Sequence, residues 1–392
     1  MVTRTTFDTL HSFENHFFEF FFYYQIDYFL FLSIIFSKMA DEVNIYIASE
    51  MAKENLYSEV TPKDLEWTLA SGSSTETQTF YLSTNEGHFA FVQMIHSNIS
   101  LWNPTIQFTS RFFGAGINTF KSVNMSNFKL SPDRRSATAD NMSIALNPEC
   151  DKYSVQLTHE KELLVVFDFE RIDRGFKIGG GKTYFGKDKS AGFVEHKFWP
   201  KGKVSGTIVV DGKAFDVSGS GLFVHAIQGM RPHLIASRWN FLNFQSKSAS
   251  LAMCEFETTP QYGSIKINQG SLMVGNKLIG VSVRNQANFI TTVLDPDTGY
   301  NIPEKILYTW EGSTLDTGEN FKARMEFDTA VLMDKIDVLN EIPYFLKKIV
   351  QAFVAKPYVY QWFNDTIAYI KIGDKDEFAV PGKLFSEATF IY

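Results

Sequence analysis

The residues with the most chemical potential lie in one run, GLFVHAIQGMRPHLIASRWNF, which covers residues 221–241. This run contains two histidines, two arginines and a tryptophan around a Gly-Met-Arg-Pro turn. His225 and His233 are eight residues apart with no acidic residue between them, whereas a metal site needs three or four converging ligands. We therefore predict no metal, no cofactor and no catalytic residue here. Two interpretations remain, the wall of an apolar ligand site and a packed structural seam.

Two other stretches resemble chemical motifs but fail on spacing. GFKIGGGKT resembles a P-loop. If Gly181–Thr183 is its G-K-T, however, the motif needs its leading glycine at position 176, which is Phe176. DPDTGYNIPEKI begins like a calcium loop, yet Gly299 replaces a ligand and Tyr300 replaces the required glycine. The hydrolase, zincin and redox signatures G-x-S-x-G, H-E-x-x-H and C-x-x-C are absent from the sequence. We interpret both stretches as turns.

The composition restricts the class of protein. A chain of 392 residues exceeds the usual size of one hydrophobic core, which favours two domains. The net charge of −7 offers no basic face, so we predict no nucleic-acid partner. The two cysteines, Cys150 and Cys254, are too few for a disulfide framework and fit a reducing compartment. These features favour an intracellular, cytoplasmic protein.

The first 38 residues differ from the rest, because they hold ten of the 38 phenylalanines. A transmembrane interpretation would place Glu19 and Asp27 in or near hydrocarbon, at about 2.5–3.5 kcal/mol for a central acidic residue. A signal peptide lacks its small-residue cleavage site. We interpret residues 1–38 as an extension of the gene model ahead of a true start at Met39, with a membrane anchor as the alternative.

From residue 65 onward the pattern predicts an all-β protein. Short runs of β-branched and aromatic residues alternate with Gly, Asn, Asp and Pro, as in sandwiches and barrels. Asp211-Gly212 predicts a two-residue hairpin that pairs Ile208 with Phe215 on one face. We place a domain boundary at 218/219, which gives domains 65–218 and 219–392.

One helix is expected in the second domain. In NEIPYFLKKIVQAFVAKP, apolar residues from Leu346 to Val354 recur at three and four residues, and Pro357 ends the pattern. We expect this helix to pack on the second barrel, since amphipathic helices usually bury their apolar face in their own protein. Membrane attachment is the alternative.

The run at 221–241 also carries a family resemblance. Together with ETQTFYL, FAFVQMIHSNI and GGGKTYFG…HKFWPKGKVSGTI, it closely resembles the fungal survival-factor family associated with oxidative-stress survival. The resemblance implies two tandem lipocalin-like antiparallel β-barrels and a non-enzymatic carrier of ceramide-like sphingolipid between endoplasmic reticulum and Golgi membranes. It also implies peripheral membrane association through an N-terminal amphipathic helix.

The segment 39–64 departs from that picture. Val43, Ile47 and Met51 are spaced for one face of an amphipathic helix and are our candidate membrane-contact residues. The same stretch is acidic, and an anionic membrane repels acidic residues. Packing on a barrel is the alternative for this segment.

The expected ligand is a sphingolipid or another hydrophobic molecule held in an apolar cavity inside at least one barrel. Strand alternation puts Phe223 and His225 on one face, and Trp239 and Phe241 on one face of the next run. The candidate ligand-binding residues are Phe223, His225, Met230, Arg231, His233, Trp239 and Phe241. The alternatives are a cofactor-independent cyclase or hydratase acting on a hydrophobic substrate, an interaction module without ligand, and structural packing of a seam between the domains.

Overall fold

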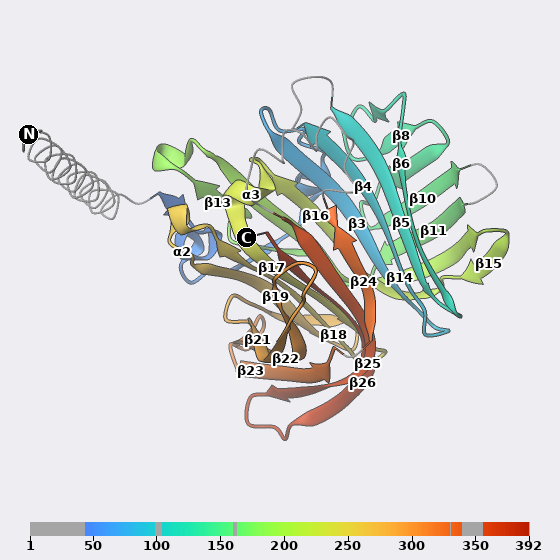
Figure 1. The fold of residues 1–392 in the computed structure, drawn as a ribbon. Coiled ribbons are helices and arrows are strands. Elements are labelled where there is room, and N and C mark those ends of the chain that lie inside the picture. Colours follow the sequence, from blue (N-terminus) through green and yellow to red (C-terminus); the bar gives the residue numbers. More distant parts are fainter. Residues whose placement is uncertain (1–43, 99–103, 160–162, 330, 339–355, 392) are drawn as a thin grey trace, which may run out of the picture. The chain divides into compact units, whose positions relative to one another are not determined.

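The computed structural model describes residues 44–98, 104–159, 163–329, 331–338 and 356–391. Two antiparallel sheets contain nearly all of the regular structure (Figure 1). The described residues from Ile45 onward belong to one unit, so the two sheets can be described together. The all-β prediction is confirmed, with a lipocalin-like arrangement of strands.

The first sheet has sixteen strands and remains an open half-barrel within the described residues. Its main path runs in the order β6-β5-β4-β3-β16-β14-β11-β10-β9-β8-β7. The strands of that path are β3 (Ser74–Thr84), β4 (Phe89–Asn98), β5 (Thr105–Gly114), β6 (Ile117–Asn124), β7 (Lys129–Leu130), β8 (Ala137–Ala139), β9 (Met142–Leu146), β10 (Lys152–His159), β11 (Leu163–Arg171), β14 (Gly192–Val210) and β16 (Gly219–Gln228). The shorter strands beside it are β1 (Ile45–Tyr46), β2 (Tyr57–Glu59), β12 (Phe176–Ile178), β13 (Lys182–Phe185) and β15 (Lys213–Asp216).

The second sheet closes into an eight-stranded barrel. Closure comes from the pairing of β20 with β22, through Gly280 with Thr314 and Val281 with Ser313. Its strands are β17 (Ala236–Gln245), β18 (Ala249–Thr258), β19 (Lys266–Val274), β20 (Lys277–Ser282), β21 (Gln286–Leu294), β22 (Asn301–Thr314), β23 (Asn320–Asp328), β24 (Leu332–Asp337), β25 (Tyr358–Ile372) and β26 (Phe378–Phe390). β21 extends from β22, and β24 pairs with β25.

The predicted hairpin is confirmed in register. Asp211 and Gly212 both have positive φ, as a type I′ turn requires. Ile208 pairs with Phe215 across β14 and β15. Local turn chemistry was sufficient to fix this pairing.

The change from one sheet to the other occurs later than the expected boundary at 218/219. Strand β16 follows that boundary, yet it pairs with β14 and β3 in the first sheet. The short helix α3 (Pro232–Ile235) then leads into β17, the first strand of the second sheet. The Gly219 region therefore marks the start of a strand within the first sheet, where a glycine fits because a Cβ would lie 2.2 Å from the Ser83 carbonyl.

The described part of the segment 39–64 does not form one amphipathic helix. It contains β1, the five-residue helix α2 (Ala48–Ala52), β2 and the 3-10 helix η2 (Pro62–Leu65). Ala48 is buried, and its amide donates a hydrogen bond to Thr183 Oγ1 at 3.1 Å. The packing alternative for this segment is the one observed here. Two further 3-10 helices are η3 (Lys187–Lys189) and η4 (Pro260–Tyr262), and the expected C-terminal helix lies outside the described residues.

The glycine-rich stretch that resembled a P-loop forms a turn between β12 and β13. Gly179 and Gly181 have positive φ, and the Gly181 amide donates to the Ile178 carbonyl at 2.9 Å. A Cβ at Gly179 would lie 2.5 Å from the Ala52 side chain. The turn therefore uses glycine because α2 packs directly against it.

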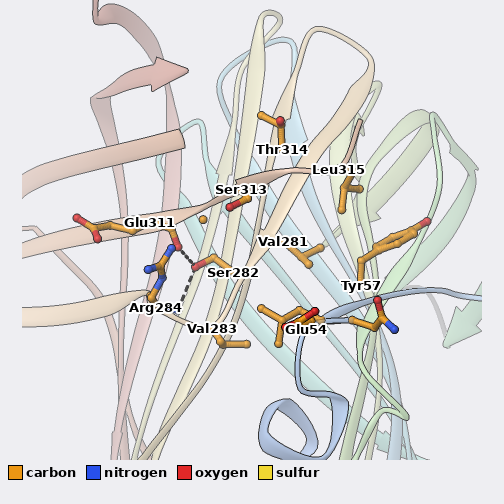
Figure 2. Close-up of a pocket in the computed structure, with 13 residues that line it drawn as sticks. Glu54, Tyr57, Val281, Ser282, Val283, Arg284, Glu311, Ser313, Thr314 and Leu315 are labelled. Atoms are coloured by element: carbon orange, nitrogen blue, oxygen red, sulfur yellow. Dashed lines mark hydrogen bonds between the residues drawn. The ribbon is translucent and has the colours of Figure 1, made fainter. Parts of the chain in front are cut away.

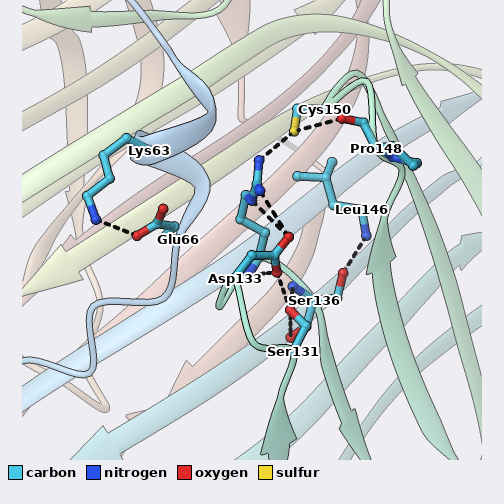
Figure 3. A network of polar contacts seen from close by, with 9 residues as sticks. Lys63, Glu66, Ser131, Asp133, Ser136, Leu146, Pro148 and Cys150 are labelled. Atoms are coloured by element: carbon cyan, nitrogen blue, oxygen red, sulfur yellow. Dashed lines mark hydrogen bonds and ion pairs between the residues drawn. The ribbon is translucent and has the colours of Figure 1, made fainter.

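Polar contacts join two turns in the part of the first sheet that runs from β7 to β10 (Figure 3). Arg135 Nη1 donates to the Cys150 thiol at 2.9 Å and forms an ion pair with Asp133. The Leu146 amide donates to Ser136 Oγ at 2.9 Å. This network joins the turn after β7 to the turn before β10, which gives Cys150 a structural role.

The interior faces of both sheets carry clusters of buried side chains. In the first sheet the buried cluster includes Phe80, Tyr153 and Phe223. In the barrel it includes Trp310 and Trp362, both almost fully buried. An eight-stranded barrel can be filled by its side chains or can hold one small ligand. The described pockets lie on the outward faces of the sheets, and a ligand inside a barrel remains a prediction.

Candidate functional site

The site lies where the outward faces of the two sheets meet. Along β3, alternation turns Phe80 into the first core and Tyr81 toward the second sheet. Tyr81 stacks on Phe241 of β17 with ring centroids 4.7 Å apart. Phe89 stacks on Phe385 of β26 at 4.4 Å. These aromatic contacts join the sheets and leave a pocket beside them.

The pocket has two lobes that share part of their lining. The larger lobe has a cavity volume of about 440 Å³ and the smaller about 300 Å³, both within the usual range for small-molecule sites. The larger lobe is lined mainly by β3, β14, β16, β17 and β26, and the smaller by β4, β5, β6 and β25. The residues that line both lobes are Tyr81, Gln93, Val338, Val359 and Glu387. These five residues and Gln361, which donates to Glu387 from the smaller lobe, form the junction of the two lobes.

The wall of the larger lobe is mainly apolar, whereas the wall of the smaller lobe is mixed, with the polar residues Gln93, Gln107, Thr109, Ser122, Gln361 and Glu387. In the larger lobe the apolar side chains are Phe198, Val224, Ala226, Pro232, Trp239, Phe241, Pro357 and Ile391, and in the smaller lobe they are Phe91, Ile95, Phe120 and Ile336. The threonines Thr75, Thr77 and Thr79 follow one edge of the larger lobe. An elongated apolar molecule with a small polar group suits such a lining.

The junction carries the main polar chemistry. Gln361 Nε2 donates to Glu387 Oε2 at 2.7 Å, and Thr389 Oγ1 donates to Glu387 Oε1 at 3.4 Å. Burial raises the pKa of the Glu387 carboxyl, against the opposing effect of these hydrogen bonds and of Arg111. On the opposite wall, Gln93 Nε2 donates to Thr79 Oγ1 at 2.7 Å. The junction can therefore bind the polar group of an amphiphile.

A buried histidine completes the wall of the larger lobe. Burial lowers the pKa of His196 to about 4, so this imidazole is neutral near pH 7. Gln269 Nε2 lies 3.3 Å from His196 Nδ1, and Cys254 Sγ lies 4.0 Å from Nε2. Burial raises the pKa of the Cys254 thiol to about 12. A neutral imidazole beside a protonated thiol adds polarity to the wall without adding charge.

The structure separates the seven candidate ligand-binding residues into three groups. Trp239 and Phe241 line the larger lobe, as expected for a ligand wall, and they also pack the seam. Phe223 and His225 lie on the opposite face of β16, inside the first sheet. Their neighbours Val224 and Ala226, which alternation turns outward, line the lobe instead.

His225 occupies a closed polar site within the first sheet. The side chain is fully buried, and its Nε2 lies 2.8 Å from Glu76 Oε1. Its Nδ1 lies 3.1 Å from the Asp64 carbonyl oxygen. Both ring nitrogens are therefore occupied by contacts with oxygen atoms of the first sheet and of the 3-10 helix η2. This arrangement accounts for His225 as a structural residue.

The remaining three candidates lie around α3. Met230 is buried in a cluster with Phe185 and Ile235. Arg231 is the N-cap residue of α3 and is half-buried. His233 lies within α3, where burial and the nearby Arg231 lower its pKa. Of this turn, it is Pro232 that lines the larger lobe.

The membrane-contact candidates differ in exposure. Met51 is 41% exposed, whereas Ile47 is half-buried against the cluster that contains Met230. Val43 lies outside the described residues. Contact of this face with a membrane remains a prediction for Met51 and Val43, and Ile47 already has an intramolecular partner surface.

Sequence reasoning missed the junction residues. Gln93 lies on β4, whereas Gln361 and Glu387 lie on β25 and β26, more than 260 residues further along the chain. Strand alternation shows that each faces away from its own core. Nothing local shows that these faces meet, so a sequence signal for the junction was not available.

A second pocket, of about 460 Å³, lies between residues 54–57 and the strands β20 and β22 (Figure 2). Ser282 Oγ there donates to the Glu311 carbonyl and accepts from the Arg284 amide. The lining includes the charged side chains of Glu54, Arg284 and Glu311. This charge suits a neutral lipid less well than the lining of the two-lobed pocket.

Within the described ranges, no three His, Cys, Asp or Glu side chains are grouped so that they could bind a metal ion. None of the helices in the same ranges combines the length and apolar character needed to cross a membrane. The two-lobed pocket is therefore the candidate functional site.

The strands and the pocket place the chain in the class of tandem lipocalin-like proteins. Comparison with known proteins identifies the family: residues 31–392 match the Svf1 family, and the chain belongs to it. A relative from Emericella nidulans, named ceramide-binding protein svf1, is 36% identical over 355 residues, which are 88% of this chain and 93% of that protein. Its Schizosaccharomyces pombe counterpart, with the same name, is 35% identical over 349 residues, 86% of this chain and 90% of that protein.

Solved structures share the fold at low sequence identity. CghA matches with a TM-score of 0.59 at 8% identity over 81% of this chain and 88% of that one. A putative AttH from Nitrosomonas europaea matches with a TM-score of 0.54 at 12% identity over 86% of this chain and 98% of that one. Kievitone hydratase from Nectria haematococca matches with a TM-score of 0.50 at 14% identity over 85% of this chain and 93% of that one. These likenesses concern the fold alone.

Proposed function

We propose that the protein binds a ceramide-like sphingolipid in the two-lobed pocket, with the polar head at the junction and the apolar chains along the lobes. The observation that carries this proposal is the shared lining: two lobes with apolar side chains in their walls meet at Glu387 and Gln93. A lipid with two chains and one small polar head has the same arrangement. The naming of the curated relatives as ceramide-binding proteins supports this ligand.

We further propose that the protein carries this lipid between endoplasmic reticulum and Golgi membranes and thereby supports survival under oxidative stress. Its location would be cytoplasmic, with peripheral attachment to these membranes. The family resemblance of the run at 221–241 supports this part of the proposal. A carrier must shield the chains of its ligand from water, and a pocket between two sheets can do so.

The pocket is tested by filling it. Ala226 faces the larger lobe from β16, and Ala226→Trp would occupy that lobe. Ala214→Trp adds the same side chain at an exposed position of β15 and is the matched control. We expect Ala226→Trp to abolish binding of a fluorescent ceramide and Ala214→Trp to leave it unchanged. Equal ceramide binding by both variants would refute this location.

A second candidate function is a cofactor-independent cyclase or hydratase acting on a hydrophobic substrate. The observation in its favour is the pair Tyr81 and Glu387, whose hydroxyl and carboxyl both line the two lobes. Burial raises the pKa of both groups, and acid–base chemistry needs a titratable group of this kind beside the bound molecule. Mass spectrometry of lipid recovered after incubation distinguishes the candidates, because a carrier returns its ligand unchanged.

A further inference from the structure

The polar groups at the junction are arranged as hydrogen-bond acceptors. Gln361 and Glu387 form a cross-strand pair on β25 and β26, and both face away from the barrel core. The Glu387 carboxylate accepts from Gln361 Nε2 at 2.7 Å, and this contact fixes which way the Gln361 amide points. The Gln361 carbonyl oxygen is buried, in a residue only 4% exposed, and has no hydrogen-bond partner in the described part of the chain.

A buried acceptor without a partner costs about 1–3 kcal/mol, which a donor from a bound molecule would recover. The carboxylate of Glu387 also retains acceptor capacity, because two oxygens offer about four lone-pair sites. Two protein donors use part of that capacity, namely Gln361 and Thr389. The junction therefore favours a head group that donates at least two hydrogen bonds.

The charges around the junction exclude an anionic head. Among the described residues that line either lobe there is no lysine or arginine. Arg111 acts on Glu387 from outside the lining and is already paired with Asp334. A phosphate or a fatty-acid carboxylate would therefore lose its hydration without gaining a cation, at a large cost in free energy.

Resting on the proposed function, we propose that Glu387 and Gln361 are the specificity-determining pair of the pocket. They select lipids that lack an anionic group and whose head carries two or more hydrogen-bond donors. A ceramide head carries an amide N–H and two hydroxyls, whereas a diacylglycerol head carries one hydroxyl. A phosphorylated ceramide fails on charge, and a free sphingoid base has one chain for two lobes.

The test compares lipids within each protein variant. Full-length protein is titrated with a fluorescent ceramide, and chain-matched diacylglycerol, ceramide phosphate and sphingosine are used as competitors. The variants are Glu387→Gln and Gln361→Leu, with Glu304→Gln as the matched control, because Glu304 is exposed on β22 of the same barrel. The ratio of ceramide to diacylglycerol affinity is measured within one sample, so partial unfolding of a variant does not alter it.

We expect the wild-type protein and Glu304→Gln to prefer ceramide over the three competitors. In Glu387→Gln and Gln361→Leu the ratio of ceramide to diacylglycerol affinity should fall about tenfold, which corresponds to ~1.4 kcal/mol. An unchanged ratio in both variants would overturn the assignment of this pair, while ceramide binding itself would stand. Equal or tighter wild-type binding of ceramide phosphate would overturn the exclusion of an anionic head, and the same result with sphingosine would contradict the use of both lobes. Failure of the wild-type protein to bind any of the four lipids would instead refute the proposed function, and this inference with it.

Discussion

Replacement of His225 by alanine tests the assignment of this residue to the structure of the first sheet. His225 is fully buried, and its two ring nitrogens contact Glu76 Oε1 and the Asp64 carbonyl oxygen. In His225→Ala the Glu76 carboxylate, in a residue 1% exposed, keeps only the amides of Thr68 and Leu69 as donors. Removal of one partner from a buried ion pair costs about 3–5 kcal/mol. This loss is a large part of a typical domain stability of about 5–15 kcal/mol.

Urea unfolding followed by tryptophan fluorescence measures the effect, because the Trp67 ring lies 5.8 Å from the His225 ring and reports on this region. His159→Ala, at a half-buried position on β10, is the control and should change the unfolding free energy by less than about 0.5 kcal/mol. The double variant His225→Ala/Glu76→Gln should be more stable than the sum of the single changes predicts. The coupling between the two sites isolates the ion pair from the lost packing.

The pH dependence provides a second measurement of the same pair. Burial alone would raise the pKa of Glu76, but the hydrogen bond and charge of His225 and the amides of Thr68 and Leu69 hold it below its ordinary value of 4.5. A carboxyl with a lowered folded-state pKa stabilises the fold above its unfolded pKa and loses this contribution as the pH falls through the folded value. The wild-type protein should therefore lose stability below about pH 4.5, and His225→Ala should lose less over that range. A loss below 1 kcal/mol in His225→Ala at pH 7, or strict additivity in the double variant, would refute the reasoning.

Two further predictions concern contacts that hold the fold together. Lys201→Met should lower the unfolding free energy by about 1–3 kcal/mol, because the Lys201 ammonium donates to the carbonyls of Ser246, Lys247 and Gly275 across the two sheets. Thermal unfolding measures this loss, with Lys203→Met at an exposed neighbouring position as the control. Equal melting temperatures of the two variants would contradict the prediction. Gly221→Ala should destabilise by about 1–3 kcal/mol, because a Cβ there would lie 2.3 Å from the Tyr81 carbonyl oxygen. Gly180→Ala is the control, because a Cβ at Gly180 has no atom within 4 Å. The same urea midpoint for both alanine variants would contradict the prediction, since the pairing of β16 with β3 would then accept a Cβ without loss of stability.

The sequence predicted features that depend on neighbours along the chain. The hairpin at Asp211-Gly212 was placed in register because its turn requires positive φ at both central residues. The alternation that put Phe223 and His225 on one face was also correct. What alternation cannot supply is which face meets the ligand, because both faces of β16 are covered, one by the first core and one by the second sheet.

The parts that the sequence did not predict depend on contacts between distant residues. The partner of His225 is Glu76, 149 residues earlier, and the pair gives no local pattern. The junction joins β4 to β25 and β26, whose order in the barrel follows only from the completed sheet. The predicted domain boundary was based on a Gly-Ser-Gly run. In the structure these glycines allow close contact between strands, because a Cβ at Gly219 or Gly221 would clash with a backbone carbonyl of β3.

The position of the pocket follows from how the two sheets can pack. The barrel interior carries a buried cluster that includes Trp310 and Trp362, whereas the two lobes lie on the outward faces of the sheets. The outward faces of two twisted sheets cannot match over their full length, and they are held together at separate points. One is the stack of Tyr81 on Phe241, a second is the Lys201 ammonium on three carbonyls, and a third is the ion pair of Arg111 with Asp334. Because Tyr81 and Phe241 belong both to this seam and to the lining of the larger lobe, a bound lipid would add contacts to the same surface that joins the sheets. Ligand binding and the cohesion of the two sheets are therefore coupled through shared side chains, and a ligand that binds only the folded protein raises its stability by mass action.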